Sequence, residues 1–384
     1  MLNVLLIEDE GVEHLYPFSL THSSWELRIG VYSIRERWIR ALSAARIVVH
    51  THRTSLQNLA TESHGSQYLE QGIPLLVMVS TCVLAPEEMR RLAALALAAE
   101  TDVALMCGEH PVGAILQASP AHPSELPTAL DALGSTDIGA HEVRGRMITR
   151  LWDVLDLIED GVTWDAELAE HHVHPTARVH QSAVIDVSKG HVIVGENAEI
   201  GAMAIVQGPC VIADHAVVKP LTHVTHSVIG PHSKIGGEVS CSVLLGYSNK
   251  QHYGFLGHSI LGEWVNLGAG TTTSNLKNTY SDVRPTMPWA RESSSRMFLG
   301  SLIGDFTRTA IGTLLPTGGV YGVCSHVIAE GLAPSSRRSF VWSEGVPYEH
   351  ASAMETCDVM MKRRGRQMTD ALGVILDEVR KRDV

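Results

Sequence analysis

The chain has 384 residues, of which 45% are hydrophobic and 19% are charged. This length allows two or three domains, and this balance is typical of globular proteins. Lys and Arg number 30 against 42 acidic residues, which gives a net charge of −12. That charge argues against general nucleic-acid binding, because a protein that neutralises phosphates needs a basic surface.

The opening residues "MLNVLLIEDEGVEH" predict a first β-strand rather than a secretory leader. The longest apolar stretch, "IPLLVMVSTCVLA", is too short to cross a bilayer, so no membrane partner is expected. No C-x-x-C pair occurs, which favours buried, reduced thiols in a cytoplasmic protein. The cysteines are Cys82, Cys107, Cys210, Cys241, Cys324 and Cys357.

Residues 1–168 predict an α/β domain. Strands are expected in "NVLLIED", "ARIVVHTH" and "IPLLVMVST", and two more around a turn in "TDVALMCGEHPVGAIL". Helical periodicity in "VYSIRERWIRALSAA" and the Pro-acid start of "PEEMRRLAALALAAE" predict helices between them. Strands alternating with helices indicate a mostly parallel sheet, which binds ligands at the carboxyl ends of its strands.

Residues 169–342 have a different periodicity, with apolar residues returning every six positions. A step of six fits neither an α-helix nor a simple strand, and it is typical of a left-handed parallel β-helix with three short sides per coil. Small residues are expected at the corners. The apolar positions are Val173, Val179, Ile185, Val194, Ile200, Val206, Ile212, Val218, Val224, Ile229, Ile235, Cys241, Leu261 and Leu267.

Three interruptions of this periodicity predict loops pushed out of the coil, namely "DVSKGH", "GYSNKQHYGFLGHS" and "SNLKNTYSDVRPTMPWARESSSRM". The cluster "HHVHP" at the entry could bind a metal, but a solvated turn is favoured because no acid or Cys lies at ligand spacing. Residues 343–384 predict one or two amphipathic helices that cover the last coil, with the basic "MKRRGR" on a solvated face.

The stretch "GGEVSCSVLLGYSNKQHYGFLGHSILGEWVNLGAGTTTSNLKNTYSDVR" resembles a known family. It is similar to the acetyltransferase half of the bifunctional N-acetylglucosamine-1-phosphate uridylyltransferase/glucosamine-1-phosphate N-acetyltransferases. It most resembles the alternative bacterial branch of that group, described as sugar nucleotidyltransferases. The resemblance is weaker in the first domain, where it rests on "LTHSSWELRIGVYSIRERW" and "RLWDVLDLI".

This resemblance implies an acetyltransferase site in the β-helix. His252 takes the place of the catalytic His, which accepts a proton from a sugar amine as the amine attacks the thioester of acetyl-CoA. An imidazole suits this task because it titrates near neutral pH. Homotrimers are usual for such proteins, with acetyl-CoA held at a subunit junction. The expected substrate contacts are Asn249, Lys250, Asn266, Asn275 and Lys277.

The same resemblance implies nucleotidyl transfer from an NTP to a sugar 1-phosphate in the first domain, with Mg²⁺. The branch has the pattern "TRP…E-x-R-x-G…EKW", which this chain matches at Arg28 and Gly30 and departs from at His22, Ser23 and Arg37. Arg28, Gly30 and Arg37 are the expected contacts to nucleotide phosphates. Asp9 is the candidate metal ligand, next to Glu8 at a strand end; both acids could equally be structural.

The expectation is a two-domain transferase of nucleotide-amino-sugar biosynthesis that acts on small molecules. Three alternatives stay open. The chain could be a nucleotidyltransferase only, with the β-helix as a trimerisation scaffold. It could be an acyltransferase only, with a degenerate first domain, which the substitutions at His22 and Ser23 favour. It could also be a non-catalytic assembly protein that binds nucleotide sugars.

Overall fold

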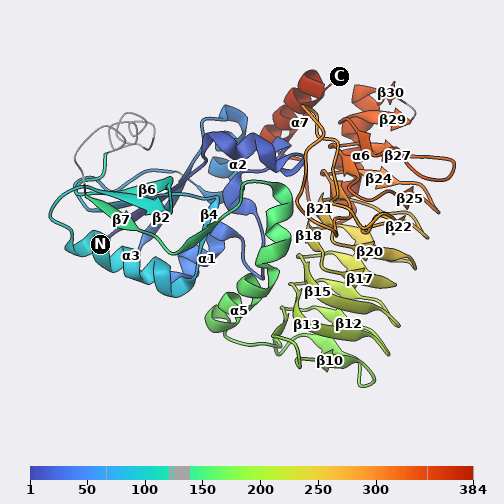
Figure 1. Cartoon of the computed structure of the whole chain (residues 1–384), viewed down its shortest axis with the longest axis horizontal. Coiled ribbons are helices and arrows are strands. Elements are labelled where there is room, and N and C mark those ends of the chain that lie inside the picture. The colour runs from blue at the N-terminus through green and yellow to red at the C-terminus, as the bar shows by residue number, and fades with distance from the viewer. Residues whose placement is uncertain (66, 121–122, 124–138, 344, 384) are drawn as a thin grey trace. The chain divides into compact units, whose positions relative to one another are not determined.

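A computed structural model describes residues 1–65, 67–120, 123, 139–343 and 345–383 (Figure 1). Among these residues, no helix combines the length and the apolar character needed to span a membrane. The chain forms two compact units. The first comprises Met1–Glu13, His22–Leu27 and Tyr32–Thr149, and the second comprises His14–Thr21, Arg28–Val31 and Arg150–Val384.

The first unit contains a six-stranded mixed sheet with the order β2-β1-β3-β6-β5-β7. Its strands are β1 (Asn3–Ile7), β2 (Arg46–His50), β3 (Leu75–Val79), β5 (Val103–Cys107), β6 (His110–Leu116) and β7 (Ala140–Glu142). The expected parallel arrangement holds for β2, β1 and β3. Strand β6 runs antiparallel to both β3 and β5, so the predicted pair around Gly108 is a hairpin.

The helices of the first unit are α1 (Ile34–Ala41), α2 (Thr54–His64) and α3 (Pro86–Ala98), and a short ladder pairs β4 (Cys82–Leu84) with β8 (Gly145–Met147). A capping box fixes the start of α1, because Ser33 Oγ accepts from the Glu36 amide and Glu36 accepts from the Ser33 amide. The predicted helices at 31–45 and 86–100 are therefore present in shortened form.

The second unit is dominated by a parallel β-helix whose coils have three sides, coloured green to orange in Figure 1. The first side consists of β9 (Arg178–Val179), β12 (Glu199–Ile200), β14 (Val217–Val218), β16 (Lys234–Ile235), β19 (Asn249–Lys250), β24 (Arg308–Thr309) and β27 (His326–Val327).

The second and third sides share two long strands, β13 (Ile205–Ile212) and β15 (His223–Ile229), which bend from one side to the next. The second side adds β10 (Val184–Asp186), β17 (Glu238–Ser240), β20 (Phe255–Gly257), β22 (Thr272–Thr273) and β25 (Leu314–Leu315). The third side adds β11 (Val192–Val194), β18 (Val243–Gly246), β21 (Ile260–Glu263), β23 (Leu302–Ile303), β26 (Val320–Tyr321) and β28 (Ser336–Arg337).

The six-residue periodicity corresponds to the inward-facing residues of these coils. The predicted positions from Val194 to Ile235, together with Leu261 and Leu267, all belong to one buried cluster, and Val179 and Ile185 are partly buried against it. Cys241 was wrongly expected among them. It lies at a corner with φ = 47°, and Val239 of β17 is the residue that points inward in that coil.

The corner between the third and first sides carries large side chains where small ones were expected. Its residues adopt left-handed backbone conformations, with φ between 52° and 62° at Asn197, His215, His232, Tyr247, Trp264, Phe306, Cys324 and Phe340. A non-glycine residue in this conformation costs about 1–2 kcal/mol. Ring stacking offsets part of that cost. Stacked rings run from His215 through His232, Tyr247 and Trp264 to Phe306, with centroids 4.2–6.0 Å apart.

The three predicted loops differ in what they contain. The first lies between β10 and β11 as expected, and the third separates β22 from β23 over residues 274–301. The second is mostly regular coil, since β18, β19 and β20 all fall within or beside it. Residues 251–254 form an ordinary corner, because four residues also separate β12 from β13 and β14 from β15; the corner between β16 and β17, with two residues, is the short one.

Helices cover parts of the β-helix. The 3₁₀ helix η5 (Leu151–Leu157) leads into α5 (Ile158–Leu168), which packs against β11, β13 and β15, so residues 150–168 belong to the second unit. A hairpin of β29 (Val341–Ser343) and β30 (Val346–Pro347) precedes α6 (His350–Lys362) and α7 (Asp370–Asp383).

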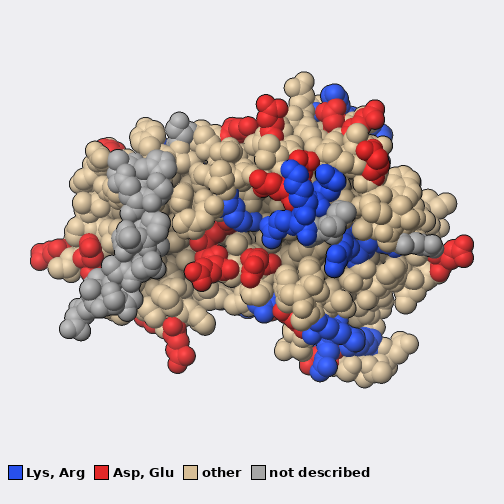
Figure 2. Space-filling view, turned by 90° about the horizontal axis from the view of Figure 1, so that it is seen from above, with Lys and Arg blue, Asp and Glu red and all other residues tan. Residues whose placement is uncertain are grey.

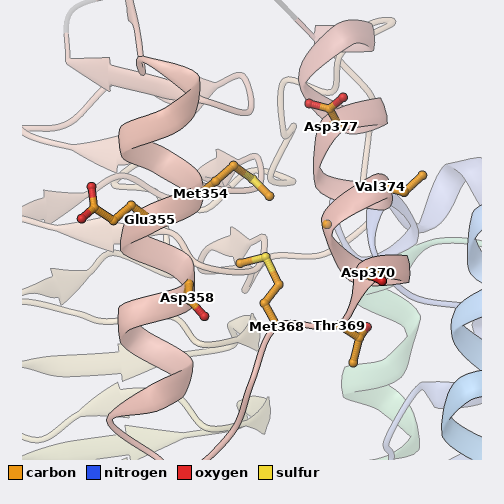
Figure 3. A pocket seen from close by; sticks show the side chains of 9 residues that line it. Met354, Glu355, Asp358, Met368, Thr369, Asp370, Val374 and Asp377 are labelled. Atoms are coloured by element: carbon orange, nitrogen blue, oxygen red, sulfur yellow. The ribbon is translucent and has the colours of Figure 1, made fainter.

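The C-terminal segment is anchored to the first side by polar contacts. Arg308 of β24 donates to Tyr348 Oη at 3.3 Å, and His326 of β27 packs against the rings of Trp342 and Tyr348. The groove between α6 and α7 has a volume of 670 Å³ and is lined by Met354, Met368 and Val374 together with four carboxylates (Figure 3). The predicted C-terminal helices are thus present, and their contacts follow the first side of the β-helix.

Candidate functional site

His252 lies at the corner between the first and second sides, in the turn of residues 251–254. Its side chain is exposed, and the neighbouring Tyr253 is 75% exposed. Tyr253 covers Gly270 of the next coil, where a Cβ atom would lie 2.9 Å from the tyrosine hydroxyl oxygen. The corner has the same four residues as the corners between β12 and β13 and between β14 and β15, and it presents the imidazole to solvent.

Lys250 does not lie on the surface, where a phosphate could reach it. The residue is 2% exposed, and its ammonium donates to the carbonyl oxygens of Gly236, at 2.7 Å, and His252, at 2.5 Å. Burial lowers the pKa of this lysine to about 8. The predicted phosphate contact has no support from this arrangement.

Asn249 and Asn266 are brought together on the outer face of the first side. Asn249 Nδ2 donates to Asn266 Oδ1 at 3.4 Å, and both residues are half-buried. Asn249 Oδ1 accepts from Arg364 at 2.7 Å and from Gln251 at 3.4 Å. These contacts connect the two asparagines to the His252 turn on one side and to the α6–α7 connection on the other.

Asn275 lies at the other end of the second side, away from the His252 corner. Its Nδ2 donates to Nδ1 of His258 at 2.8 Å, and the His258 ring stacks on Phe298 with centroids 5.2 Å apart. Burial, and to a lesser extent His226 and Arg296, lower the pKa of His258 to about 4. His258 is consequently neutral near pH 7 and a weak base for an amine proton.

The lowered pKa of His258 makes the stability of the β-helix depend on pH. The unfolded chain binds this proton below about pH 6.5 and the folded chain only near pH 4, so stability is lost as the pH falls through this window. We expect the melting temperature to drop between pH 7 and pH 5. The drop should be smaller in His258→Asn, measured by calorimetry at both pH values; an equal drop in both proteins would contradict this role.

Lys277 lies in the loop of residues 274–301 and donates to the carbonyl oxygen of Asp282. That loop is tied to helical segments of the same unit, since Arg296 forms ion pairs with Asp153 and Asp156. On the face seen in Figure 2, Lys and Arg side chains lie next to Asp and Glu side chains rather than forming a continuous basic surface, in keeping with the net charge of −12.

In the first unit, polar side chains gather at the carboxyl ends of β1, β2 and β3. Glu8, directly after β1, accepts from the Ser24 amide at 2.8 Å and from Thr51 Oγ1 at 2.5 Å. Arg53 forms a salt bridge to the same carboxylate and donates to the carbonyl oxygen of His22 at 2.9 Å. Glu8 is therefore a buried structural anion, and Arg53 provides positive charge beside the position where the family pattern has Arg.

Asp9 is the remaining carboxylate at this edge. One oxygen accepts from the Gly11 amide at 3.0 Å and the other accepts from Thr81 Oγ1. In the described part of the chain, no group of three or more His, Cys, Asp and Glu could hold a metal ion. Asp9 fits a Mg²⁺ ion only in the manner usual for this metal, with one carboxylate and the other positions taken by phosphates and water.

The three predicted phosphate contacts fall in different compact units, Arg37 in the first and Arg28 and Gly30 in the second. Arg28 donates to the carbonyl oxygen of Val31 at 2.5 Å. Arg37 lies on the buried face of α1, with 0% of the residue exposed. Gly30 belongs to the second unit and faces α5, where a Cβ atom would lie 2.7 Å from the carbonyl oxygen of Gly161. Gly30 thus permits close packing against α5.

We expect Gly30→Ala to destabilise the protein rather than to weaken nucleotide binding alone. The new methyl group would collide with backbone on α5, and overpacking of this kind costs about 1–3 kcal/mol. The melting temperature without ligand should therefore fall by several degrees. A normal melting temperature with a raised Kd for NTP would instead favour the phosphate contact.

Sequence patterns did not identify Arg53, Gln251 or Arg364 as part of these sites. Arg53 is 45 residues from Glu8, and Arg364 is 115 residues from Asn249, so no local pattern links the partners. The run "MKRRGR" was expected on a solvated face; Arg366 is exposed as expected, and Arg364 is half-buried against the β-helix. Arg364 bonds Asn249 and the His232 carbonyl oxygen, and Arg366 bonds Tyr247 Oη at 2.9 Å.

Two family models match successive parts of the chain. Residues 4–173 match the family model of the sugar nucleotidyl transferases, and residues 168–278 match that of the GMPPB C-terminal domain. A hexapeptide transferase family protein from Anaplasma phagocytophilum, known from its crystal structure, aligns with 53% of this chain and 92% of its own, at 15% identity and a TM-score of 0.24.

Two curated relatives are described as bifunctional. A bifunctional sugar-1-phosphate nucleotidylyltransferase/acetyltransferase from Sulfurisphaera tokodaii is 36% identical over 132 residues, 33% of each chain. The bifunctional protein GlmU of Methanococcus aeolicus is 27% identical over 215 residues, 54% of this chain and 51% of that protein. The matches thus span between a third and a half of these relatives. Residues 4–173 are thus similar to the sugar nucleotidyl transferases, and the part of the β-helix within residues 168–278 is similar to the GMPPB C-terminal domain.

Proposed function

We propose that the β-helix transfers an acetyl group from acetyl-CoA to the amine of an amino-sugar phosphate, with His252 as the general base. The observation that carries this proposal is the exposed imidazole at the corner between the first and second sides, connected through Gln251 to Asn249 and Asn266. The relatives named as nucleotidylyltransferase/acetyltransferases support the same reaction class.

In this reaction the neutral amine nitrogen attacks the thioester carbonyl carbon while His252 accepts the amine proton. The C–N bond forms, the C–S bond breaks, and the departing sulfur takes a proton to become the free thiol of CoA. Asn249 and Asn266 present amide groups beside the turn and are proposed to orient the sugar or the acyl donor. Asn275 and Lys277 remain proposed contacts from the neighbouring corner and loop.

A homotrimer is proposed because an apolar stripe follows the second side and the corner that bears His252. Its members are strongly exposed: Met203 59%, Leu221 69%, Tyr253 75%, Ile311 81%, Leu314 45% and Leu332 64%. Exposed apolar surface of this extent is typical of protein interfaces. A second copy seated on this stripe would border His252 directly, so the acetyl donor would lie between two chains.

For the first unit we propose nucleotidyl transfer from an NTP to a sugar 1-phosphate at the carboxyl edge of β2, β1 and β3. Ligands of such sheets bind at this edge. Arg53, which donates to the His22 carbonyl oxygen, is proposed to attract the phosphates, and Arg28 and Arg37 remain proposed phosphate contacts. Mg²⁺ bound at Asp9 would neutralise charge on the phosphates. A cytoplasmic location also stays a prediction.

Ligand-induced stabilisation tests both halves together. A ligand that binds the native protein raises its melting temperature by mass action. The panel contains acetyl-CoA, UTP with Mg²⁺, dTTP with Mg²⁺, glucosamine 1-phosphate and N-acetylglucosamine 1-phosphate. Free thiol released from acetyl-CoA with glucosamine 1-phosphate would establish acetyl transfer, and pyrophosphate released from an NTP would establish nucleotidyl transfer.

Each alternative predicts a distinct outcome of these assays. Thiol release without pyrophosphate would favour an acyltransferase with an inactive first domain. Pyrophosphate without thiol would favour a nucleotidyltransferase with a scaffolding β-helix. Stabilisation by ligands with neither product would favour a protein that binds nucleotide sugars without turnover.

A further inference from the structure

Lys250 occupies an inward position of the first side that is apolar in the three preceding coils and is Thr309 in β24. The corresponding inward residues of β12, β14 and β16 are Ile200, Val218 and Ile235, and all three belong to the buried cluster. Strand β19 aligns Lys250 with Ile235, so its aliphatic stem enters the same interior. The only described coil with this substitution is the one whose next residues form the His252 turn.

The ammonium group of Lys250 joins two successive coils at that corner. It donates to the Gly236 carbonyl oxygen in the preceding coil, at 2.7 Å, and to the His252 carbonyl oxygen in its own coil, at 2.5 Å. The corner of the preceding coil, residues 236–237, is two residues shorter than the 251–254 corner, whereas β12 and β13, and likewise β14 and β15, are separated by four residues. The two neighbouring corners therefore cannot pair residue by residue, and the ammonium group bridges them.

A buried lysine can serve to fill the interior or to pair with a carboxylate, and neither explanation applies to Lys250. An apolar side chain of equal length would fill the interior without the cost of removing a charge from water. A carboxylate does not compensate the charge, because the lowered pKa of Lys250 results from burial and not from a neighbouring acid. What the ammonium adds to a methionine-like stem is therefore the pair of hydrogen bonds at the corner.

We propose that Lys250 is a positioning residue, which holds the backbone of the His252 turn so that the imidazole is presented at a fixed place on the corner. This inference rests on the proposed acetyl transfer for its functional consequence. Its structural part, a turn fixed by the buried ammonium, stands independently of any activity. It also replaces the earlier expectation that Lys250 contacts a phosphate.

The test compares the full-length protein with Lys250→Met, which keeps the length of the stem and removes the donors. Lys189→Met is the matched control, because Lys189 is an exposed lysine in the loop between β10 and β11. Hydrogen–deuterium exchange followed by mass spectrometry is measured for peptides that cover residues 251–257. We expect Lys250→Met to raise early deuterium uptake at least about two-fold there and to leave β12 and β14 unchanged, with uptake in Lys189→Met unchanged throughout.

Kinetics separate positioning from substrate contact. If acetyl transfer is found, Lys250→Met should lower kcat by about ten-fold or more with little change in the KM for the sugar phosphate. A raised KM with unchanged uptake at 251–257 would overturn the proposal in favour of a direct phosphate contact. Increased uptake across all coils would also overturn it, since Lys250 would then be a general core residue. If the wild type shows no acetyl transfer, the proposed function fails while the exchange experiment still decides the role of Lys250.

Discussion

Replacing His252 by alanine is expected to lower kcat for acetyl transfer by about 10²–10⁴-fold, the range attributed to a general base. The side chain is exposed and lies outside the buried cluster of the β-helix, so the variant should fold and melt as the wild type does. The KM for acetyl-CoA should change little, because the imidazole acts on the amine proton. The assay measures thiol release with acetyl-CoA and glucosamine 1-phosphate.

His171→Ala is the matched control, since His171 is an exposed histidine before the first coil. Its rate should equal that of the wild type. Acetylation at the wild-type rate in His252→Ala would remove His252 from the mechanism. Loss of activity in His258→Ala but not in His252→Ala would move the base to the corner occupied by Asn275, against the expectation from the lowered pKa of His258.

Gly230→Ala is expected to disrupt the stacking of two coils and to destabilise the β-helix by about 3 kcal/mol, the upper part of the range for overpacking. Gly230 follows β15, and its amide donates to the Leu244 carbonyl oxygen at 2.8 Å. A Cβ atom there would lie 2.0 Å from the Leu245 carbonyl oxygen and 2.4 Å from that of Leu244. Both neighbours are backbone atoms of the next coil, so the collision cannot be relieved by turning a side chain.

Gly373→Ala is expected to leave the stability of the protein unchanged or to raise it. Gly373 lies in α7, and a Cβ atom there would meet no heavy atom within 4 Å. An alanine inside a helix stabilises it by about 0.5–1 kcal/mol relative to glycine. Calorimetry should therefore show a lower transition temperature for Gly230→Ala and an unchanged or higher one for Gly373→Ala. A normal transition for Gly230→Ala would mean that the coils can separate locally at no cost.

The β-helix could be predicted from the sequence because its inward residues obey a simple spacing. The prediction failed at Cys241, where the spacing changes: β16 and β17 are separated by two residues and the next pair of strands by four. It also failed at Lys250, because lysines are rarely buried without a partner and the general rule places them outside. Both exceptions lie in the two coils that border the His252 turn.

The first domain was harder to predict, for two physical reasons. The apolar run of β6 does not encode whether the strand pairs in parallel or antiparallel fashion, and it pairs antiparallel with β3. The motif around Gly30 matched a family pattern and therefore predicted a phosphate contact. In the structure, Gly30 and Gly161 each permit close packing of backbone in the second unit. The salt bridge between Glu8 and Arg53 depends on tertiary structure that no local pattern reports.

The column of rings at one corner has a consequence for how the coils find their partners. The inward residues of all three sides are similar apolar side chains. A coil shifted in register by one side would therefore bury nearly the same apolar surface. The corners are not equivalent, since the stack from His215 to Phe306 follows one corner only. A coil wound out of step would move its ring to another corner and break the column on both sides. The rings therefore distinguish the correct winding from misfolded forms that the apolar core alone would accept.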